Sequence, residues 1–499
     1  MNGQESAASD FTTAQYNGLT DDQLMDFAQQ GAFQYFWAGG HPFCGMAREG
    51  IGLGHPLDTV TIGGTGFGLM SIVVGSERSW VTRAQAADRT RRILRFLDGV
   101  RPDNSALPSG VQRYHGAWAH HYNGNTGATI PFAGAADNGA DLVETAFLIS
   151  GMLTARQYFD HPTDPVEAEI RSRATSMWHA VEWSWFRRTA NNTFLYWHWS
   201  PNFGWQMNLP IRGFNETQII YLLAIASPTF PVPASLYHTG YAGLPGYVNG
   251  NFYFGLQQFV GEPLGGPLFF THYSNVGFDP RYKRDQFCNY FENHRNISLI
   301  NRAYCIENPL GWELYNPLNW GLTASNNPTG YSAQSPTNDN GTISPTAALS
   351  AMAYVPQESL ATLRYWYDNF GGDVFGIYGA VDAFNFSADW VAPGWLAIDQ
   401  GPIVVMIENH RSELCWRLFM SNPEIAPMMN AVAMRYEIDF DLDGDVDATD
   451  MAIALTAMAG PGVTTGPPGV TPAQFADSDL DNDGDVDMHD AAIGQQLVR

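Results

Sequence analysis

Three acidic residues stand at regular spacing in front of an apolar segment. Asp137, Asp141 and Glu144 are four and three positions apart, which places them on one face of a helix that begins at Asp137. The next two turns are almost purely apolar, so we expect this helix to be buried. Like charges crowded on a buried face raise one another's pKa, as a general acid or base requires. Alternatively, the acids only complement the helix dipole, with Asp137 as N-cap, which leaves Glu144 unexplained.

Another acid, Glu216, begins an apolar segment directly after an aromatic loop at 196–205. A carboxyl group framed by aromatic rings is partly desolvated, and its raised pKa keeps it protonated near neutral pH, as in glycosidases. The same spacing also suits an acid at a helix start that pairs with Arg212. Both interpretations stay open on the sequence.

Two more acids are isolated. Asp399 lies in an apolar run, where burial without a role would be costly, although it could be the N-cap of a helix at 400–420. Asp339 lies in an Asn-Asp-Asn-Gly segment, where a turn residue is the simpler interpretation.

Other chemistries lack their motifs. His120 and His121 are adjacent and cannot comfortably bind one metal ion, and the glycine-rich stretch 63–68 lacks the Lys-Ser/Thr pair of a phosphate loop. No Gly-x-Ser-x-Gly elbow occurs, which argues against a serine hydrolase. The acids and aromatic residues that remain are typical of glycoside cleavage, and we expect no cofactor in that reaction.

Near the C-terminus, two 12-residue loops begin 40 positions apart. Each has acidic side chains at loop positions 1, 3, 5, 9 and 12, glycine at position 6, and a backbone carbonyl from an Asp at position 7, as a calcium loop requires. The pattern predicts two calcium ions, and the alternatives are a solvated acidic tail or a purely stabilising calcium site. The predicted ligands are Asp439, Asp441, Asp443, Asp445, Asp447 and Asp450 in the first loop, and Asp479, Asp481, Asp483, Asp485, Asp487 and Asp490 in the second.

Composition narrows the class of protein. The net charge is −25, of which residues 437–499 carry −13, and Lys283 is the single lysine. Without a basic patch, nucleic acid and anionic membranes are poor partners. No run of 18 apolar residues occurs, so we expect no membrane span. The first residues do not read as a signal peptide, yet calcium loops of this class suit extracellular calcium, so we expect a secreted or cell-surface protein whose leader has been removed.

The hydrophobic periodicity predicts an all-α protein. Expected helices cover 21–37, 83–97, 137–159, 165–185, 215–226, 286–295, 346–353, 356–369 and 397–420. Long glycine-, proline- and aromatic-rich loops separate them, and loops of that length are usually functional. We expect an (α/α) toroid with a loop-lined cleft over residues 1–436 and a small helical calcium-loop module over 437–499. Four cysteines are too few for a disulfide scaffold, and a Cys288–Cys305 bond stays open.

The large region also resembles a known family. The segments that carry the resemblance are 137–144, 214–216, 271–281, 319–325, 339–348 and 390–403. They resemble the "glycoamylase" family, which includes the endo-β-1,2-glucanases of glycoside hydrolase family 144. The resemblance implies an (α/α)6 barrel and an anomer-inverting, endo-acting hydrolysis of linear β-1,2-glucan to sophoro-oligosaccharides.

The resemblance also implies residue roles. It gathers Asp137, Asp141, Glu144 and Glu216 in the cleft, with Asp399 nearby. By the inverting scheme, we expect Glu216 to be the acid and Asp137 or Asp141 the base, with Asp399 as a rival base. The residues expected to contact sugar are Trp199, Trp205, Arg212, Tyr273, Arg281, Trp320 and Asp339.

The duplicated acidic loops resemble a type I dockerin. That resemblance implies attachment to a cohesin domain of another protein and leaves the chemistry of the large region unchanged. Three hypotheses therefore remain from the sequence: the endo-β-1,2-glucanase, an exo-acting enzyme or transglycosylase on another or cyclic β-glucan, and a non-catalytic glycan-binding component.

Overall fold

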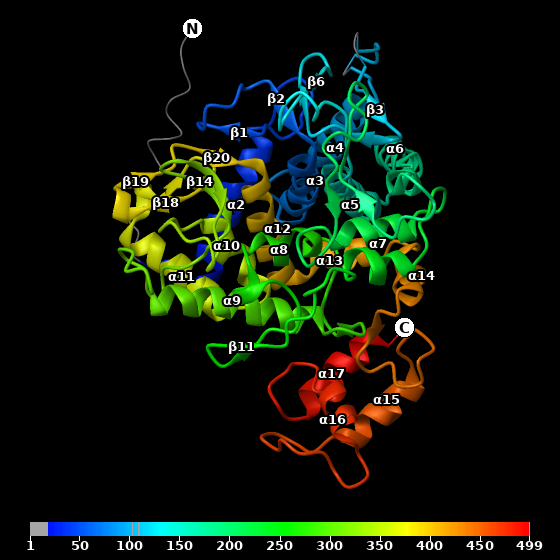
Figure 1. Cartoon of the computed structure of the whole chain (residues 1–499), viewed down its shortest axis with the longest axis vertical. Helices are drawn as coiled ribbons and strands as arrows, with labels where there is room; N and C mark the ends of the chain where they lie inside the picture. The colour runs from blue at the N-terminus through cyan, green and yellow to red at the C-terminus, as the bar shows by residue number, and fades with distance from the viewer. Residues whose placement is uncertain (1–17, 102, 108–109, 499) are drawn as a thin grey trace. The chain divides into compact units, whose positions relative to one another are not determined.

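The computed structural model describes residues 18–101, 103–107 and 110–498 (Figure 1). The first 17 residues of the predicted 1–436 domain, on which the leader expectation rests, lie outside the described residues. The chain divides into two compact units: one covers residues up to 279 and 294–425, and the other covers 280–293 and the residues from 426 onward.

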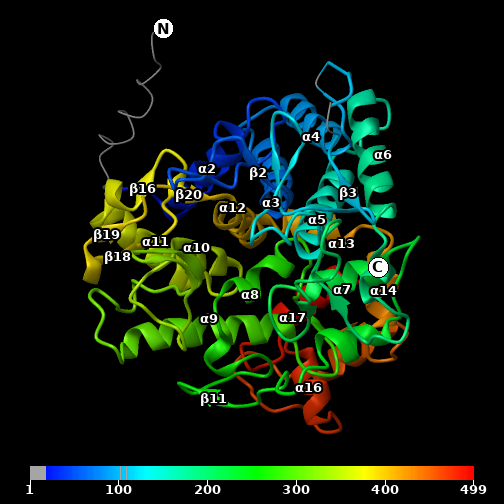
Figure 2. The same cartoon turned by 45° about the horizontal axis from the view of Figure 1, so that its top comes forward.

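Helices dominate the large unit (Figure 2). Buried helices alternate along the chain with amphipathic ones. The buried helices are α3 (Ile62–Glu77), α5 (Leu142–Tyr158), α7 (Gln218–Ala226), α10 (Pro345–Ser350) and α12 (Ala397–Ser412). The amphipathic helices are α2 (Asp21–Trp37), α4 (Arg83–Leu97), α6 (Pro165–His179) and α11 (Pro356–Asn369). The remaining helices before residue 432 are α8 (Phe269–His272), α9 (Tyr290–Glu307), α13 (Leu414–Met420) and α14 (Ile425–Ala431). An inner layer of apolar helices and an outer layer of half-buried helices follow from this alternation.

The described strands are short and form only small antiparallel sheets, none of them closed. Two sheets connect distant segments near the acids: β2 (Thr59–Thr61), β5 (His121–Asn123) and β6 (Thr129–Ile130) form one, and β7 (Ala140–Asp141) with β9 (His198–Trp199) the other. The other pairs in the large unit are β1 (Gly50–Ile51) with β20 (Trp395–Leu396), β3 (Arg113–Tyr114) with β4 (Ala117–Trp118), β8 (Leu195–Tyr196) with β10 (Pro210–Ile211), β11 (Phe252–Tyr253) with β12 (Leu256–Gln257), β14 (Ala324–Asn327) with β15 (Gly330–Ala333), β16 (Phe375–Gly376) with β17 (Gly379–Ala380), and β18 (Phe384–Asn385) with β19 (Trp390–Val391).

Helix α3 is absent from the sequence prediction. Its glycines do not form a phosphate loop; they let α3 and α5 pack closely. A Cβ atom on Gly66 would lie 2.2 Å from the carbonyl oxygen of Phe147, and one on Gly151 would lie 2.1 Å from the carbonyl oxygen of Gly66. Backbone therefore packs on backbone where these two buried helices cross.

Several predicted helix boundaries are wrong. Helix α9 covers Tyr290–Glu307 where 286–295 was predicted, and α6 ends at His179 where 185 was predicted. Two other differences concern the acids. The helix expected from 137 begins at Leu142, because Asp141 is extended (φ −116°, ψ 107°) and pairs with His198 across β7 and β9. Asp137, Asp141 and Glu144 therefore do not share one helix face, and Asp141 rather than Asp137 is the N-cap. The helix expected at 397–420 is two helices, α12 and α13, separated by Glu413 in the left-handed conformation (φ 59°).

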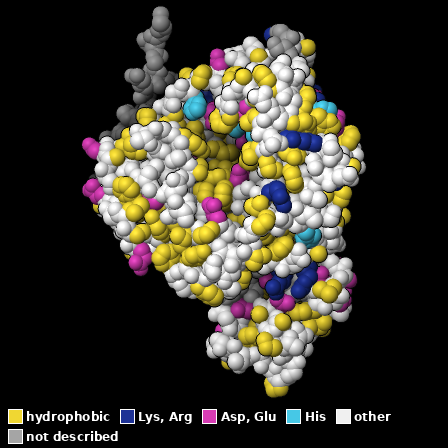
Figure 3. All heavy atoms as spheres, in the orientation of Figure 1, with side chains coloured by type: hydrophobic (Ala, Val, Ile, Leu, Met, Phe, Trp, Pro, Cys, Tyr) yellow, Lys and Arg dark blue, Asp and Glu magenta, His cyan; other side chains and the backbone are white. Residues whose placement is uncertain are grey.

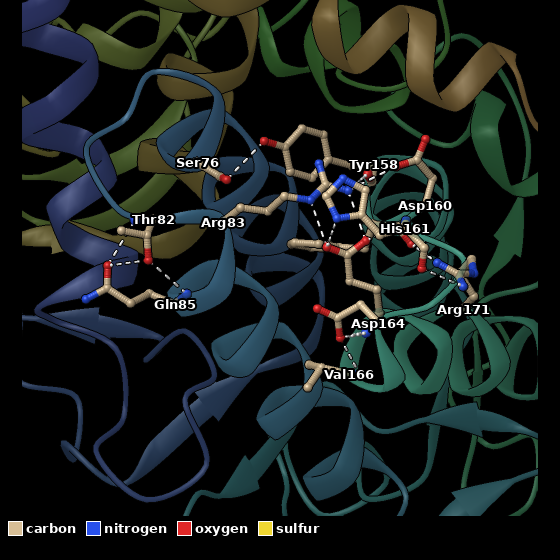
Figure 4. Close-up of polar contacts among 12 residues, drawn as sticks. Ser76, Thr82, Arg83, Gln85, Tyr158, Asp160, His161, Asp164, Val166 and Arg171 are labelled. Atoms are coloured by element: carbon tan, nitrogen blue, oxygen red, sulfur yellow. Dashed lines mark hydrogen bonds and ion pairs between the residues drawn. The ribbon is translucent and has the colours of Figure 1, made fainter.

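Arg83, the first residue of α4, joins three helices through charged hydrogen bonds (Figure 4). Its guanidinium donates to both carboxylate oxygens of Glu167 on α6, at 2.7 and 3.0 Å, and to the carbonyl oxygen of Tyr158 at the end of α5, at 2.6 Å. It also bonds Asp160 at 3.0 Å. Glu167 is buried, so this bidentate pair satisfies a carboxylate that water cannot reach.

The second unit contains the duplicated acidic loops. Its helices are α14 from Ala426 onward, α15 (Ala448–Ala454), α16 (Pro472–Ser478) and α17 (Met488–Leu497). In the same unit, β13 (Lys283–Arg284) pairs with β21 (Arg435–Tyr436). A small apolar core of Ile438, Met451, Leu480 and Val486 lies between the loops and these helices.

Within the described ranges, none of the helices combines the length and apolar character that crossing a bilayer demands. Cys44, Cys288, Cys305 and Cys415 are all buried free thiols, so the Cys288–Cys305 bond is not formed.

Replacing Arg83 by methionine should destabilise the large unit. Arg83→Met leaves the buried Glu167 without its partner, and we expect a loss of about 2 kcal/mol in the free energy of unfolding, measured by urea denaturation with tryptophan fluorescence. Arg92→Met on the same helix is the matched control, because Arg92 only approaches the exposed Asp88 at 3.8 Å, and it should cost less than about 0.5 kcal/mol. Equal losses in the two variants would contradict the role of the Arg83 network.

Candidate active site

Asp141 connects the start of α5 to a pair of histidines. One carboxylate oxygen, Oδ1, accepts hydrogen bonds from the backbone N–H groups of Val143 and Glu144, both at 3.0 Å. The other, Oδ2, lies 3.3 Å from His198 Nε2 and 3.3 Å from His120 Nδ1. The β7–β9 register sets His198 opposite Asp141, so the same backbone pairing that ends the strand also positions the imidazole.

Asp137 and Glu144 complete this cluster. Asp137 Oδ1 lies 3.8 Å from His198 Nε2, and Asp137 Oδ2 accepts the N–H of Ala133 at 3.0 Å. Glu144 Oε1 lies 3.8 Å from His120 Nε2. The three acids that the sequence placed on one helix face are thus brought together, although only Glu144 belongs to the helix. We call Asp137, Asp141, Glu144, His120 and His198 the histidine–acid cluster.

Glu144 also binds the first turn of α3. Its Oε2 accepts the N–H of Gly63 at 2.7 Å, and this N–H has no acceptor within the helix. A Cβ atom on residue 63 would lie 2.5 Å from that oxygen, so glycine is required for the contact. The carbonyl oxygen of His120 accepts the N–H of Ile62 at 3.1 Å, so both chain segments converge on the N-terminus of α3.

The cluster separates the protonation states of its members. Burial opposes charge on Asp141, but His198 and His120 outweigh it and hold its pKa below the ordinary range. Burial would lower the pKa of His120, but the carboxylates of Glu144 and Asp141 outweigh it and raise this pKa to about 10. Burial raises the pKa of Glu144 to about 7, with Asp141 adding to the effect and His120 opposing it. At neutral pH the cluster therefore holds ionised Asp141, protonated His120 and a Glu144 that titrates.

A neighbouring pair, Glu49 and His121, lies beside this cluster. His121 Nε2 is 2.9 Å from Glu49 Oε2. Burial alone would raise the pKa of Glu49, but His121 and then His120 lower it to about 2.

Glu216 lies two residues before α7, whereas the sequence predicted a helix at 215–226 that includes it. Its backbone carbonyl accepts the Ser274 hydroxyl at 2.5 Å, and Ser274 Oγ in turn accepts the N–H of Ile219 at 3.1 Å, so the first turn of α7 is anchored. Its side chain is only half-buried, yet desolvation, together with the charges of Glu144 and Asp141, raises its pKa to about 7. No ion pair joins Glu216 and Arg212; Arg212 instead donates to the carbonyl oxygen of Gly243 at 2.7 Å.

Asp399 lies in the first turn of α12 and is 1% exposed. It is not the N-cap, a position that Leu396 occupies. The Tyr273 hydroxyl donates to Asp399 Oδ1 at 3.5 Å. Burial, with the charge of Asp382, raises the pKa of Asp399 well above its usual value. Burial, with the charges of Asp399, Glu216 and Glu144, raises the pKa of the Tyr273 hydroxyl well above its usual value.

Aromatic rings gather on the loop that carries His198. Trp205 stacks on Trp185 with ring centroids 4.6 Å apart, and Trp199 meets the edge of Trp185 at 5.3 Å. The Arg188 guanidinium lies over both Trp205 and Tyr196, at 4.7 and 3.3 Å from the ring centres. Trp199 and Trp205 are partly exposed, as rings that stack on sugars must be.

Three expected sugar contacts have other surroundings. Trp320 is 0% exposed and lies in the core, so its ring presents no face to a ligand. The Asp339 carboxylate accepts hydrogen bonds from the Tyr304 hydroxyl, the Trp312 indole and the Tyr315 hydroxyl. These bonds hold the surrounding loop together, which favours the turn interpretation. Arg281 belongs to the second unit, where its guanidinium lies 5.4 Å from the centre of the Tyr282 ring.

Sequence reasoning missed His120, His198, Glu49 and Asp382. His120 was considered only as a metal ligand. The alternation Trp197-His198-Trp199 in the aromatic loop was the one local signal for His198, since a polar residue between two tryptophans in a short strand faces the opposite side from them. Asp382 has no such signal, because its partner Asn326 is 56 positions away.

Two kinds of acidic group could hold a metal ion. In the large unit, Asp137, Asp141 and His198 each offer an atom within 4.8 Å of the others, but the imidazoles already balance these carboxylates. In the second unit, Asp439, Asp441 and Asp450 meet in the same way, as do two triplets of the second loop.

The two acidic loops of the second unit have the same internal geometry. The last Asp of each loop accepts hydrogen bonds from three backbone N–H groups. Asp450 accepts from Phe440 at 2.7 Å, Asp441 at 3.3 Å and Asp447 at 3.0 Å. Asp490 accepts from Leu480 at 2.7 Å, Asp481 at 3.2 Å and Asp487 at 2.8 Å. The glycine at loop position 6 has positive φ in both, 99° and 95°. Each loop thus contains one turn that needs glycine, and its last Asp is buried against the loop backbone.

Figure 3 shows a hollow in the large unit, with hydrophobic side chains on its wall and acidic side chains among them. This hollow is the candidate cleft.

Comparison with known proteins agrees with this geometry. A family model described as "Glycoamylase: Putative glucoamylase" matches residues 208–423. A solved "putative glucoamylase" from Bacteroides uniformis is 47% identical with a TM-score of 0.80, over 84% of this chain and 99% of that one. An endo-β-1,2-glucanase from Chitinophaga pinensis, solved with sophorotriose and glucose, is 43% identical with a TM-score of 0.79, over 84% and 99% of the two chains.

A protein from Parabacteroides distasonis, named exo β-1,2-glucooligosaccharide sophorohydrolase (non-reducing end), is 42% identical over 440 residues. The match covers 84% of this chain, but the chain spans only 59% of the length of that relative.

These likenesses define the class: the chain belongs to the glucoamylase-like family of glycoside hydrolases. Within that family, it resembles the proteins named for β-1,2-glucan cleavage. The resemblance inferred from the sequence motifs is confirmed for the large region.

The protonation of His120 can be measured directly. Because its pKa is about 10, His120 should keep its proton at about pH 8, which a histidine-selective NMR titration reports, with His120→Gln used for assignment. Glu144→Gln should lower that pKa, since the Glu144 carboxylate is the largest contribution that raises it. Glu182→Gln is the matched control, because Glu182 pairs at 2.8 Å with His115 outside the cluster, and it should leave His120 unchanged. A His120 signal that titrates near its ordinary pKa of about 6.5 would contradict the ion-pair geometry.

Proposed function

We propose that this chain hydrolyses linear β-1,2-glucan, with inversion of the anomeric carbon, in the cleft of an (α/α)6 barrel. The observation that carries the proposal is the combination of a protonatable carboxyl, Glu216, with a ring of acids on the N-termini of buried helices. The alternation of buried and amphipathic helices supports the barrel, since its inner and outer layers require that pattern.

Glu216 is the proposed general acid. Its pKa of about 7 keeps a large fraction protonated at neutral pH, and its half-buried side chain leaves it open to a ligand. It gives its proton to the glycosidic oxygen as the bond from that oxygen to the anomeric carbon breaks.

Asp399 is the proposed general base, in preference to Asp141. Both oxygens of Asp141 are engaged, one by two N–H groups and the other by two imidazoles, and its low pKa makes it a weak proton acceptor. A raised pKa makes ionised Asp399 a stronger base. It takes one proton from a water molecule whose oxygen bonds to the anomeric carbon on the face opposite the leaving group, so one water is consumed and the configuration inverts.

The histidine–acid cluster then binds and orients sugar hydroxyls. Asp137 has a buried Oδ1 without a hydrogen-bond partner, and Asp141 and His120 provide a fixed pair of opposite charges. Hydroxyl groups both donate and accept, so such a cluster suits a sugar ring. Trp199 and Trp205 offer partly exposed aromatic faces for neighbouring sugars.

We favour endo action. This chain matches the full length of the Chitinophaga endo-glucanase, but only 59% of the length of the Parabacteroides protein named for exo action. Exo action is the second candidate, supported by that relative's name.

Product analysis tests this function. We expect the purified protein to convert linear β-1,2-glucan into a ladder of sophoro-oligosaccharides, and to leave β-1,3-, β-1,4- and α-1,4-glucans intact. Glu216→Gln should lower kcat by about 100-fold or more, because the leaving oxygen loses its proton donor. Glu313→Gln, at an exposed position, is the matched control.

A single short product would indicate exo action, and larger rings or longer chains would indicate a transglycosylase. Binding of the glucan without cleavage would leave only the glycan-binding interpretation. NMR of the fresh product should show the α-anomer, since inversion at a β-linkage produces it.

We also propose that the second unit binds two calcium ions, docks in that form onto a cohesin domain, and belongs to a secreted or cell-surface protein. Asp439 Oδ1 and Asp485 Oδ1 are buried and have no hydrogen-bond partner. Buried oxygens without a partner are expected where a cation binds. The first-loop ligands would be Asp439, Asp441, Asp443, Asp447 and Asp450 with the carbonyl of Asp445, and the second loop repeats them 40 positions later.

Calcium binding should be countable. Calorimetric titration of the chelator-treated full chain should give two sites, and Asp450→Ala and Asp490→Ala should each remove one. Asp373→Ala, in the large unit, should keep both. Chelation should lower the thermal stability of the second unit and leave glucan hydrolysis unchanged, because no calcium loop belongs to the cluster of catalytic acids. Absence of any calcium-dependent heat would refute the assignment.

A further inference from the structure

An exposed phenylalanine, Phe132, lies directly over the histidine–acid cluster. Its ring stacks on the ring of His120, with centroids 4.1 Å apart and planes inclined by 28°. It meets the ring of His121 edge-on, with centroids 5.2 Å apart. Phe132 is nevertheless 53% exposed, so one side of its ring is occupied by histidines and the remainder is open to solvent. Single exposed apolar side chains are ordinary on a protein surface, but this one borders the site.

The loop that carries Phe132 is built on an acid of the cluster. After β6 the chain turns back, and the N–H of Phe132 donates to the carbonyl oxygen of Asp137 at 3.3 Å. The N–H of Ala133 donates to Asp137 Oδ2 at 3.0 Å, and the N–H of Asp137 donates to the carbonyl oxygen of Gly134 at 3.0 Å. The backbone of Phe132 is thus fixed by Asp137, and its ring by the histidines.

The same loop offers a ligand apolar contact and little else. Residues 131–136 read Pro-Phe-Ala-Gly-Ala-Ala, without a charged side chain or one that can hydrogen-bond, and residues 131–135 are exposed. The face of an aromatic ring carries partial negative charge, which attracts C–H groups. A β-glucosyl ring presents C–H groups on both faces, because its hydroxyl groups point outward around the edge. The open side of Phe132 therefore suits a sugar ring better than it suits water.

A positive charge lies beneath the Phe132 ring. Burial would lower the pKa of His120, but the carboxylates of Glu144 and Asp141 outweigh it and raise this pKa to about 10. The negative face of an aromatic ring attracts a cation within about 6 Å of its centre. Beneath Phe132, the His120 side chain is only 15% exposed. Shielding of this charge and stacking on a sugar are separate roles, and they predict different effects of substitution.

We propose that Phe132 binds substrate: its open face stacks on a glucosyl unit next to the unit whose hydroxyl groups the histidine–acid cluster binds. The proposal rests on the proposed function for the identity of the glucan. A stacking ring stabilises the bound substrate and the transition state alike, so its loss raises KM and leaves kcat nearly unchanged.

Three substitutions separate stacking from shielding. Phe132→Trp keeps an aromatic face, Phe132→Leu keeps an apolar cover over His120 without a ring, and Phe132→Ala removes both. We expect Phe132→Trp to keep KM for linear β-1,2-glucan within about threefold, and the other two to raise it by about tenfold or more, with kcat within about threefold. A Phe132→Leu enzyme with the KM of wild type would overturn the proposal, and so would a loss in Phe132→Ala confined to kcat.

Phe252→Leu is the matched control. Phe252 is 66% exposed on the β11–β12 hairpin, and its substitution should change neither KM nor kcat. An equal rise of KM in Phe252→Leu and Phe132→Leu would show a general effect of exposed rings and would overturn a subsite at Phe132.

Binding without turnover separates this proposal from the proposed function. In a Glu216→Gln background, calorimetric titration with linear β-1,2-glucan should give a Kd about tenfold higher with Phe132→Leu and an unchanged Kd with Phe252→Leu. Equal Kd values would overturn the stacking role even if the wild-type enzyme hydrolyses this glucan.

Cleavage of a different glucan by wild type would refute the proposed substrate alone. The same Kd comparison on that glucan then decides the role of Phe132: about tenfold weaker binding supports it, and equal binding overturns it. A protein that binds none of the glucans would overturn both proposals.

Discussion

Burying negative charge is the constraint on which the large unit depends. Asp141 caps α5, Glu144 bonds the first turn of α3, Asp399 lies in the first turn of α12, and Glu216 lies just before α7. A helix N-terminus carries unsatisfied N–H groups and partial positive charge, so it is the place in an apolar interior where a carboxylate is least costly. Several buried helices must therefore direct their N-termini to one region, and the glycine contacts of α3 with α5 bring two of these ends close.

The acids differ from one another because their remaining neighbours differ. Asp141 has two imidazoles and stays ionised. Asp399 has another carboxyl group and a phenol, which favour a proton. Burial raises the pKa of Glu216, and the negative charges of Glu144 and Asp141 add to this effect. One fold thus gives its acids different protonation behaviour: the pKa of Asp141 is held low, whereas the pKa values of Asp399 and Glu216 are raised.

The sequence predicted what local patterns determine. The helices at 21–37 and 83–97 begin and end as expected, since each follows a Thr-x-x-Gln capping box and has an apolar stripe. Helix α3 escaped prediction because it is apolar on all sides and contains five glycines, so it shows no helical period. The start of α5 was wrong because a strand pairing with His198, 57 positions away, overrides the local acid spacing.

The same limit applies to the site. The acids of the cluster could be found from the sequence because they lie at helix starts, where spacing is informative. His198, Glu49 and Asp382 could not, because each acquires its role from a partner that only the tertiary fold brings near. Trp320 shows the converse: a tryptophan near a motif is more often core than ligand platform, and only burial distinguishes the two.

The two units solve the problem of crowded acids in opposite ways. In the large unit, imidazoles and helix N-termini neutralise the carboxylates from within the protein, so the charge balance of the site is set by folding alone. In the acidic loops, Asp450 and Asp490 receive backbone N–H groups, but the surrounding acids face mainly one another. We propose that a cation from solution relieves their repulsion, which would make the second unit responsive to calcium, whereas the acids of the large unit are balanced by groups of the protein itself.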